Sequence, residues 1–116
     1  MNVMFTTNSS NLSDADVAAI SRLSRVLKEF PELNIRLDGY SDPRGNKADN
    51  LILSQKRAES VKQAFKKFGI SPARVVINAH GEMTIADTNV DLDAYAMARK
   101  VSVNFSTQPS DRVAQN

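Results

Sequence analysis

The hydrophobic residues of this chain change from a helical to a strand spacing, and this change limits the folds open to it. An apolar stripe of helical spacing lies between Ser13 and Pro31, and its members are Val17, Ile20, Leu23, Leu27 and Phe30. Ser13 can cap this helix, with Asp16 three residues on. Ile35 and Leu37 then alternate with polar residues, as in a half-buried strand. The sequence therefore predicts a long helix that packs on a sheet.

The alternation of strands and helices continues along the chain. A second long helix is expected from near Asn50 to Phe68, and a short one around residues 92–97. The run from Val75 to Ile77 is more continuously apolar, which favours a central strand. The expected strands lie at residues 3–5, 35–39, 75–77 and 101–105. The order β-α-β-α-β-(α)-β predicts an α+β fold, a two-layer sandwich in which two long helices cover a small mixed sheet.

Size and composition indicate one globular domain. With 116 residues, 41% hydrophobic and 24% charged, the chain suits a single core. We expect this domain at residues 1–105 and a flexible tail at 106–116. The net charge of +2 comes from 15 basic and 13 acidic residues that are mixed along the chain, so nucleic acid is not an expected partner.

The start of the chain and its lack of cysteine bear on where it works. Met1 is followed by a polar, strand-like segment with neither a signal peptide nor a lipid-anchoring cysteine, and no stretch could span a bilayer. If the protein is exported, we expect this chain to be a piece of a longer one. The absence of cysteine excludes a thiol nucleophile and a disulfide framework.

Asp42 and Arg57 are candidates for a charged site. Asp42 follows the second expected strand, and Arg57 borders the apolar stripe of the second long helix. A buried guanidinium needs a partner, and Asp42 is the nearest acidic candidate on that side. The residues alone leave two interpretations open. The pair is either a salt bridge that fastens a loop, or a clamp in which Asp42 accepts an ammonium and Arg57 donates to a carboxylate of one zwitterionic ligand.

Further groups could join this site. Asn8 and Asn50 lie on two other segments expected at the same edge of the sheet and could add amide contacts. The start of the second helix offers N–H groups to an anion. Asn50 can equally be the cap of that helix.

Two patterns that resemble reactive sites are set aside. His80 is the single histidine, and nothing nearby supplies a nucleophile on a suitable turn. The acidic run at 87–93 resembles a calcium loop, but Leu92 and Ala98 replace the required Gly and Glu. We therefore expect a protein that is not an enzyme and that holds no metal or cofactor.

Two motifs around the charged pair resemble a known family. Residues 38–45 read Asp-Gly-Tyr-Ser-Asp-Pro-Arg-Gly, and residues 50–58 read Asn-Leu-Ile-Leu-Ser-Gln-Lys-Arg-Ala. They are similar to the Gly-His-Thr-Asp turn and the Asn-x-x-Leu-Ser-x-x-Arg-Ala segment of the OmpA-like carboxy-terminal domain. That domain occurs in outer-membrane proteins, peptidoglycan-associated lipoproteins and flagellar stator proteins. The resemblance extends over about residues 3–105.

The resemblance implies a function as well as a fold. It implies non-covalent binding of the diaminopimelate residue of Gram-negative peptidoglycan, with Asp42 on its ammonium and Arg57 on its carboxylate. Asn8 and Asn50 would line the pocket, and Arg99 would lie close to it. The expected role is a periplasmic domain that binds the stem peptide and ties an envelope protein to the cell wall, with membrane contact only through a separate N-terminal anchor.

The sequence also departs from the family pattern. Tyr40 and Ser41 replace the usual His and Thr, Arg44 adds a charge to the loop, and Ala98 stands where Asn is usual. The rival expectation is an envelope scaffold that binds another protein, with a purely structural Asp42–Arg57 pair. Whether the domain forms a homodimer is left open.

Overall fold

The elements of the protein follow the predicted order in a computed structural model that describes residues 1–83 and 92–107. The strands are β1 (Asn2–Met4), β2 (Asn34–Ser41), β3 (Val75–Glu82) and β4 (Lys100–Ser106). The helices are α1 (Asp14–Glu29), α2 (Lys47–Lys67) and α3 (Leu92–Ala98), with a short 3-10 helix, η1 (Pro72–Arg74). The expected tail from residue 106 lies mostly outside the described residues, as does most of the acidic run at 87–93.

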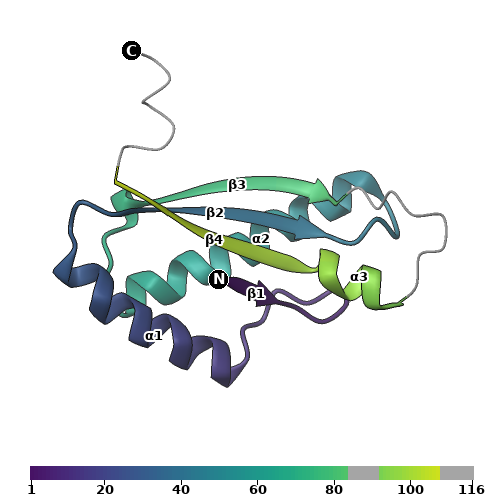
Figure 1. The fold of residues 1–116 in the computed structure, drawn as a ribbon. Helices are drawn as coiled ribbons and strands as arrows, with labels where there is room; N and C mark the ends of the chain where they lie inside the picture. The colour runs from purple at the N-terminus through teal and green to yellow at the C-terminus, as the bar shows by residue number, and fades with distance from the viewer. Residues whose placement is uncertain (84–91, 108–116) are drawn as a thin grey trace, which may run out of the picture.

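The four strands form one mixed sheet. Their order is β1-β4-β2-β3, in which β2 and β3 are parallel and β4 runs antiparallel to both β1 and β2. The two long helices, α1 and α2, lie on the same side of this sheet (Figure 1). The predicted α+β two-layer sandwich is thus confirmed. Within the described residues, no helix is both long and apolar enough to cross a membrane.

The expected central position of the strand at Val75 is wrong, because β3 lies at an edge of the sheet. Helix α2 is the crossover between the parallel strands β2 and β3, and β4 already occupies the other side of β2. Val75 is buried, whereas Val76 and Ile77 are half-buried. An apolar run therefore showed that one face is covered but not which strands lie beside it.

The core lies between the sheet and the two long helices. The predicted stripe of α1 contributes the buried residues Ile20 and Leu27, and α2 contributes Val61 and Phe65. The Ser13 hydroxyl accepts the N–H of Asp16 at 3.1 Å, so the predicted cap of α1 is confirmed.

Close contact between β2 and α2 positions the end of the strand. A side chain at Gly39 would collide with the carbonyl oxygen of Ser54, so glycine lets the helix lie directly on the strand. β2 also continues past Gly39 to Ser41, further than expected. Odd-numbered residues of β2 face the helices, so Ser41 points toward α2 and Tyr40 lies on the opposite face.

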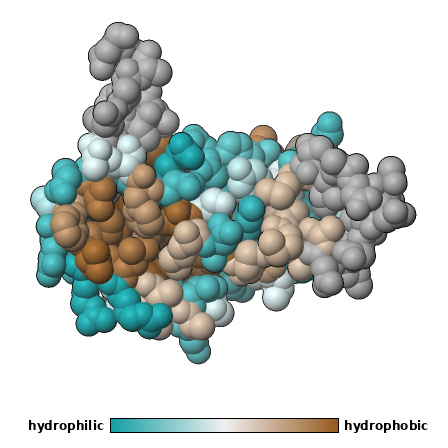
Figure 2. Space-filling view, viewed as in Figure 1, coloured by the Kyte–Doolittle hydropathy of each residue, from teal (hydrophilic) through white to brown (hydrophobic). Residues whose placement is uncertain are grey.

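Apolar side chains are also exposed on the surface, away from this end of β2. They gather around the last turns of α1 and the end of β4 (Figure 2), where Val26, Phe30 and Phe105 are exposed. Phe105 pairs with Ile35 near the start of β2. This patch is therefore at the opposite end of β2 from Asp42.

Candidate functional site

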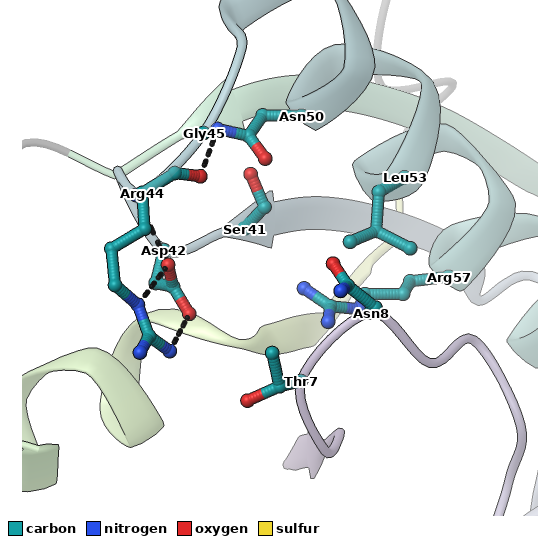
Figure 3. A pocket seen from close by; sticks show the side chains of 9 residues that line it. All are labelled: Thr7, Asn8, Ser41, Asp42, Arg44, Gly45, Asn50, Leu53 and Arg57. Carbon is teal, nitrogen blue, oxygen red and sulfur yellow. Dashed lines mark hydrogen bonds and ion pairs between the residues drawn. The ribbon is translucent and has the colours of Figure 1, made fainter.

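A pocket of about 250 Å³ opens where β2 ends. Its walls are the β1–α1 loop, the turn after β2 and the first turns of α2 (Figure 3). Four of the five sequence-predicted site residues line it, namely Asn8, Asp42, Asn50 and Arg57, and the remaining lining residues are Thr7, Ser41, Arg44, Gly45 and Leu53. Segments far apart in the sequence thus meet as the prediction required.

Arg57 is completely buried, with 0% of its surface exposed. Its guanidinium donates hydrogen bonds to the carbonyl oxygens of Ser9 at 2.8 Å, Tyr40 at 3.0 Å and Thr6 at 3.1 Å. These bonds tie the β1–α1 loop and β2 to α2. They use three of the five N–H groups of an arginine, and the other two make no hydrogen bond to a described residue.

Among the described residues, Asp42 forms salt bridges with Arg44 and Arg99 and none with Arg57. Of the two interpretations that the sequence left open, a salt bridge between Asp42 and Arg57 is therefore wrong. Arg57 is held by neutral carbonyl groups and has no carboxylate within ion-pair distance in the described part of the chain. Burial lowers the pKa of Arg57 to about 10, and the positive charge of Arg99 adds to this effect. The site therefore contains a buried positive charge that no carboxylate directly neutralises.

Asp42 binds two other arginines. Arg44 forks onto it, with Nε 3.0 Å from Oδ1 and Nη2 2.9 Å from Oδ2, and its backbone N–H donates to Oδ1 at 3.1 Å. Arg99 donates to Oδ2 at 3.3 Å. The hydrogen bonds from Arg44 are the main cause that lowers the pKa of Asp42 to about 2.

Arg99 supports the site from behind. Its Nε donates to the carbonyl oxygen of Phe5 at 3.0 Å, while its Nη1 reaches Asp42. The predicted position of Arg99 close to the pocket is therefore found, although its side chain is not among those that line the pocket.

Asn50 has a different local role from the predicted helix cap. α2 begins three residues earlier than expected, at Lys47, because Asn46 caps it by accepting the N–H groups of Ala48 and Asp49. Those two N–H groups are consequently not offered to an anion, contrary to expectation. Asn50 instead donates from its amide to the carbonyl oxygen of Arg44 at 3.0 Å, which fastens the turn after β2.

Asn8 is in the left-handed backbone region, with φ of 56°. Asparagine tolerates this region better than most residues do. Asn8 and Arg57 both line the pocket (Figure 3).

Ser41 is a site residue that the sequence did not single out. It is 1% exposed, and its hydroxyl has no hydrogen-bond partner among the described residues, although it borders the pocket. A buried hydroxyl without a partner costs roughly 1–3 kcal/mol. The signal available in the sequence was the place of Ser41 directly before Asp42. The sequence analysis named Ser41 and Arg44 only as departures from a family pattern, not as residues of the candidate site.

The arrangement suits binding of a charged ligand. Asp42 is the single carboxylate among the described residues that line the pocket, whereas Arg44 and Arg57 line it and Arg99 donates to Asp42. The unpaired donors at Arg57 and the free hydroxyl of Ser41 favour an anionic group. Asp42 could accept a cationic group once one of its present partners moves aside.

Comparisons with known proteins agree with this fold. The model of the OmpA family matches residues 4–99. The chain is 30% identical to the probable lipoprotein YiaD of Escherichia coli K12 over 105 residues, which are 90% of this chain and 48% of that protein. It thus spans about half the length of that relative.

Two solved structures show the same architecture. The peptidoglycan-associated lipoprotein from Burkholderia pseudomallei has a TM-score of 0.81 and 28% identity, over 90% of this chain and 89% of that one. The C-terminal domain of Helicobacter pylori MotB also has a TM-score of 0.81, over 98% of this chain and 90% of that one, and its 19% identity supports the fold alone. Because the family model matches more than half of its residues, the chain belongs to the OmpA family.

Proposed function

We propose that this domain binds peptidoglycan without covalent chemistry, through the ammonium and carboxylate groups of a diaminopimelate residue in the stem peptide. The observation that carries the proposal is Arg57, a buried guanidinium that forms no ion pair with a carboxylate of the described residues and makes only three hydrogen bonds to them. Its pKa of about 10 keeps it charged at neutral pH. A ligand carboxylate would neutralise it.

The position of Asp42 supports a zwitterionic ligand over a simple anion. Asp42 and Arg57 lie on opposite sides of the same pocket, with Ser41 between them (Figure 3). An ammonium and a carboxylate carried by one carbon could approach the two charges together. Asn8 and Asn50 would supply further polar contacts, and Arg99 would hold Asp42 in place.

The similarity to a peptidoglycan-associated lipoprotein supports the choice of ligand. A single diaminopimelate residue offers two charge-assisted contacts of about 1.5–3 kcal/mol each, so one site should bind weakly. The cell wall repeats this residue, and repeated sites strengthen attachment of anything held at its surface. In this proposal the domain is the periplasmic anchor of a longer envelope protein.

Calorimetric titration with two peptides tests the proposal. One peptide contains diaminopimelate, and the other contains lysine, which keeps the side-chain ammonium but lacks the side-chain carboxylate. We expect the lysine peptide to bind roughly 10- to 150-fold more weakly, because it loses one charge-assisted contact. Equal binding of both peptides would contradict the role of Arg57.

A matched pair of variants tests the acidic side of the pocket. Asp42→Asn should abolish measurable binding. Asp38→Asn is the same chemical change four residues earlier, away from the pocket, and should leave binding unchanged. Circular dichroism would show that both variants are folded. Binding that survives in a folded Asp42→Asn variant would contradict the proposal.

A scaffold that binds another envelope protein is the rival function. The three carbonyl groups held by Arg57 favour it, because they give the residue a structural role without a ligand. Sedimentation with purified cell-wall sacculi separates the two functions. Anchoring predicts that the domain sediments with the sacculi and releases no soluble fragments from them, whereas a scaffold would stay in solution.

A further inference from the structure

We propose that Arg44 is an internal competitor for the ligand's ammonium group, because it occupies the carboxylate of Asp42 in the free domain. The inference rests on the proposed function and concerns the affinity of the same pocket. In this proposal Arg44 stabilises the free domain, whereas Arg57 stabilises the complex with the ligand. Arg44 opposes binding, and Arg57 promotes it.

The hydrogen bonds to Asp42 leave little room for a ligand. An ionised carboxylate has about four lone-pair positions. Oδ1 accepts the backbone N–H and the Nε of Arg44, while Oδ2 accepts Nη2 of Arg44 and Nη1 of Arg99. A ligand ammonium can therefore bind Asp42 strongly only if one of these guanidinium groups leaves.

Arg44 is the group able to leave. Its side chain is 42% exposed, whereas that of Arg99 is 15% exposed and is also bonded to the carbonyl oxygen of Phe5. Moving Arg44 need not disturb the loop, because Asn50 holds the backbone carbonyl oxygen of Arg44. The guanidinium of Arg44 also lies 4.4 Å from the ring centre of Tyr95 in α3. Arg44 makes this contact while it is bound to Asp42, so its displacement would have to keep or replace the contact with the ring.

The competition would weaken every ligand that binds Asp42, and a ligand with both charges would offset this cost at Arg57 and Ser41. When only part of the protein is in the competent state, the apparent affinity of a ligand falls by that fraction. A ligand that brings only an ammonium must displace Arg44 without any gain at Arg57. A ligand that brings both charges gains the unpaired donors of Arg57 and the hydroxyl of Ser41 as it displaces Arg44.

Removal of the competitor tests the inference directly. Titration of Arg44→Gln with the diaminopimelate peptide should show affinity about two- to fivefold higher than that of the wild type, the range set by an exposed ion pair. The lysine peptide should gain by a similar factor, because the competition acts only at Asp42.

Arg36→Gln is a matched control. Arg36 is 45% exposed and pairs with Asp38 two residues away at 2.9 Å, as Arg44 pairs with Asp42, but it lies on the other face of the sheet. The control loses the same charge and the same kind of ion pair. Its affinity should equal that of the wild type, which separates the local effect from the change in net charge.

A measurement without ligand tests whether Arg44 pairs with Asp42 in the free domain. A ¹³C NMR titration of the Asp42 carboxyl group should show that Arg44→Gln raises its pKa from about 2 toward the ordinary value of 3.8. A pKa that does not move in Arg44→Gln would overturn the inference, because Arg44 would then not occupy Asp42 in solution.

The binding results separate the inference from the proposed function. If the wild type binds the peptide and Asp42→Asn does not, but Arg44→Gln binds equally or more weakly, the competition is refuted and the proposed function stands. If Arg44→Gln binds and the wild type shows no measurable binding, the competition is supported in its strongest form. If neither binds, both the proposed function and the competition are refuted.

Discussion

Asp38 and Asp42 are near neighbours with similar local chemistry, yet only one of them adjoins a pocket. Each side chain is about 9% exposed and pairs at 2.9 Å with an arginine two residues away, Arg36 or Arg44. Each also has a further partner, which is His80 for Asp38 and Arg99 for Asp42. The two ion pairs alone therefore do not distinguish a surface network from a candidate binding site.

The surroundings make the difference. Asp38 lies on the side of the sheet away from the helices, where His80 and Asn104 complete its hydrogen bonds and Tyr40 stacks on His80 with ring centres 4.8 Å apart. Asp42 faces a pocket lined by Ser41, whose hydroxyl has no partner among the described residues, and by Arg57, which makes three hydrogen bonds to them with its five N–H groups. Unsatisfied polar groups next to an ion pair thus indicate a binding site more strongly than the ion pair does.

The largest expected effect comes from Arg57, which has no counterpart near Asp38. Arg57→Gln should lower the free energy of unfolding by about 3 kcal/mol or more, because three partly buried carbonyl groups would lose a charged donor, at about 1 kcal/mol or more each. Urea unfolding measures the change. Arg74→Gln is the control, since Arg74 also donates to carbonyl oxygens, those of Leu33 and Phe30, but lies closer to solvent. An equal loss in both variants would contradict a special role for Arg57.

The second effect is the acid sensitivity of Asp42. Its pKa is about 2 in the folded chain and 3.8 ordinarily, so its stabilisation is complete above the ordinary value and is lost as the pH falls through about 2. The wild type should exceed Asp42→Asn in unfolding free energy by about 2 kcal/mol at neutral pH, and this excess should shrink between about pH 4 and pH 2. A constant excess over that range would contradict the assignment.

Asp38 gives the comparison for this pH dependence. Burial acts to raise its pKa, but hydrogen bonds from His80 and Arg36 outweigh burial and lower it. Its contribution should therefore be lost in the same direction, as the pH falls. Unfolding of Asp38→Asn over the same pH series measures how much of the acid sensitivity belongs to each carboxylate.

A smaller effect of opposite sign is expected at Ser41. Ser41→Ala should raise the free energy of unfolding by about 1 kcal/mol, because it removes a buried hydroxyl without a partner, and it should weaken peptide binding. Ser24→Ala is the control, since the buried Ser24 hydroxyl donates to the carbonyl oxygen of Ile20 at 2.7 Å. The control should not stabilise the fold. A destabilised Ser41→Ala would show that the hydroxyl has a partner in solution.

The smallest effect is expected at Tyr40, whose side chain belongs to the Asp38 network. Tyr40→His restores the residue that is usual in the family, on the face of the sheet away from the pocket. We expect peptide affinity to change by less than about twofold, as for most substitutions away from a site. Calorimetric titration measures it, and a tenfold change would show that the two regions communicate.

The sequence by itself determined the order of the elements and the location of the site. The stripe from Val17 to Phe30 and the alternation at Ile35 and Leu37 are local patterns, and local patterns depend only on which face of a helix or strand is buried. The family motifs placed Asp42 and Arg57 at one pocket, and the structure brings them together with Asn8 and Asn50.

Only the tertiary structure decided which groups pair. From the sequence, either Arg57 or Arg44 could have paired with Asp42. In the structure Asp42 pairs with the exposed Arg44, and Arg57 donates to three backbone carbonyl groups. The edge position of β3 and the unpaired hydroxyl of Ser41 were decided in the same way. Such pairings depend on distances between segments that are remote in sequence and on competition among several donors. The local spacing of residues predicts neither of these.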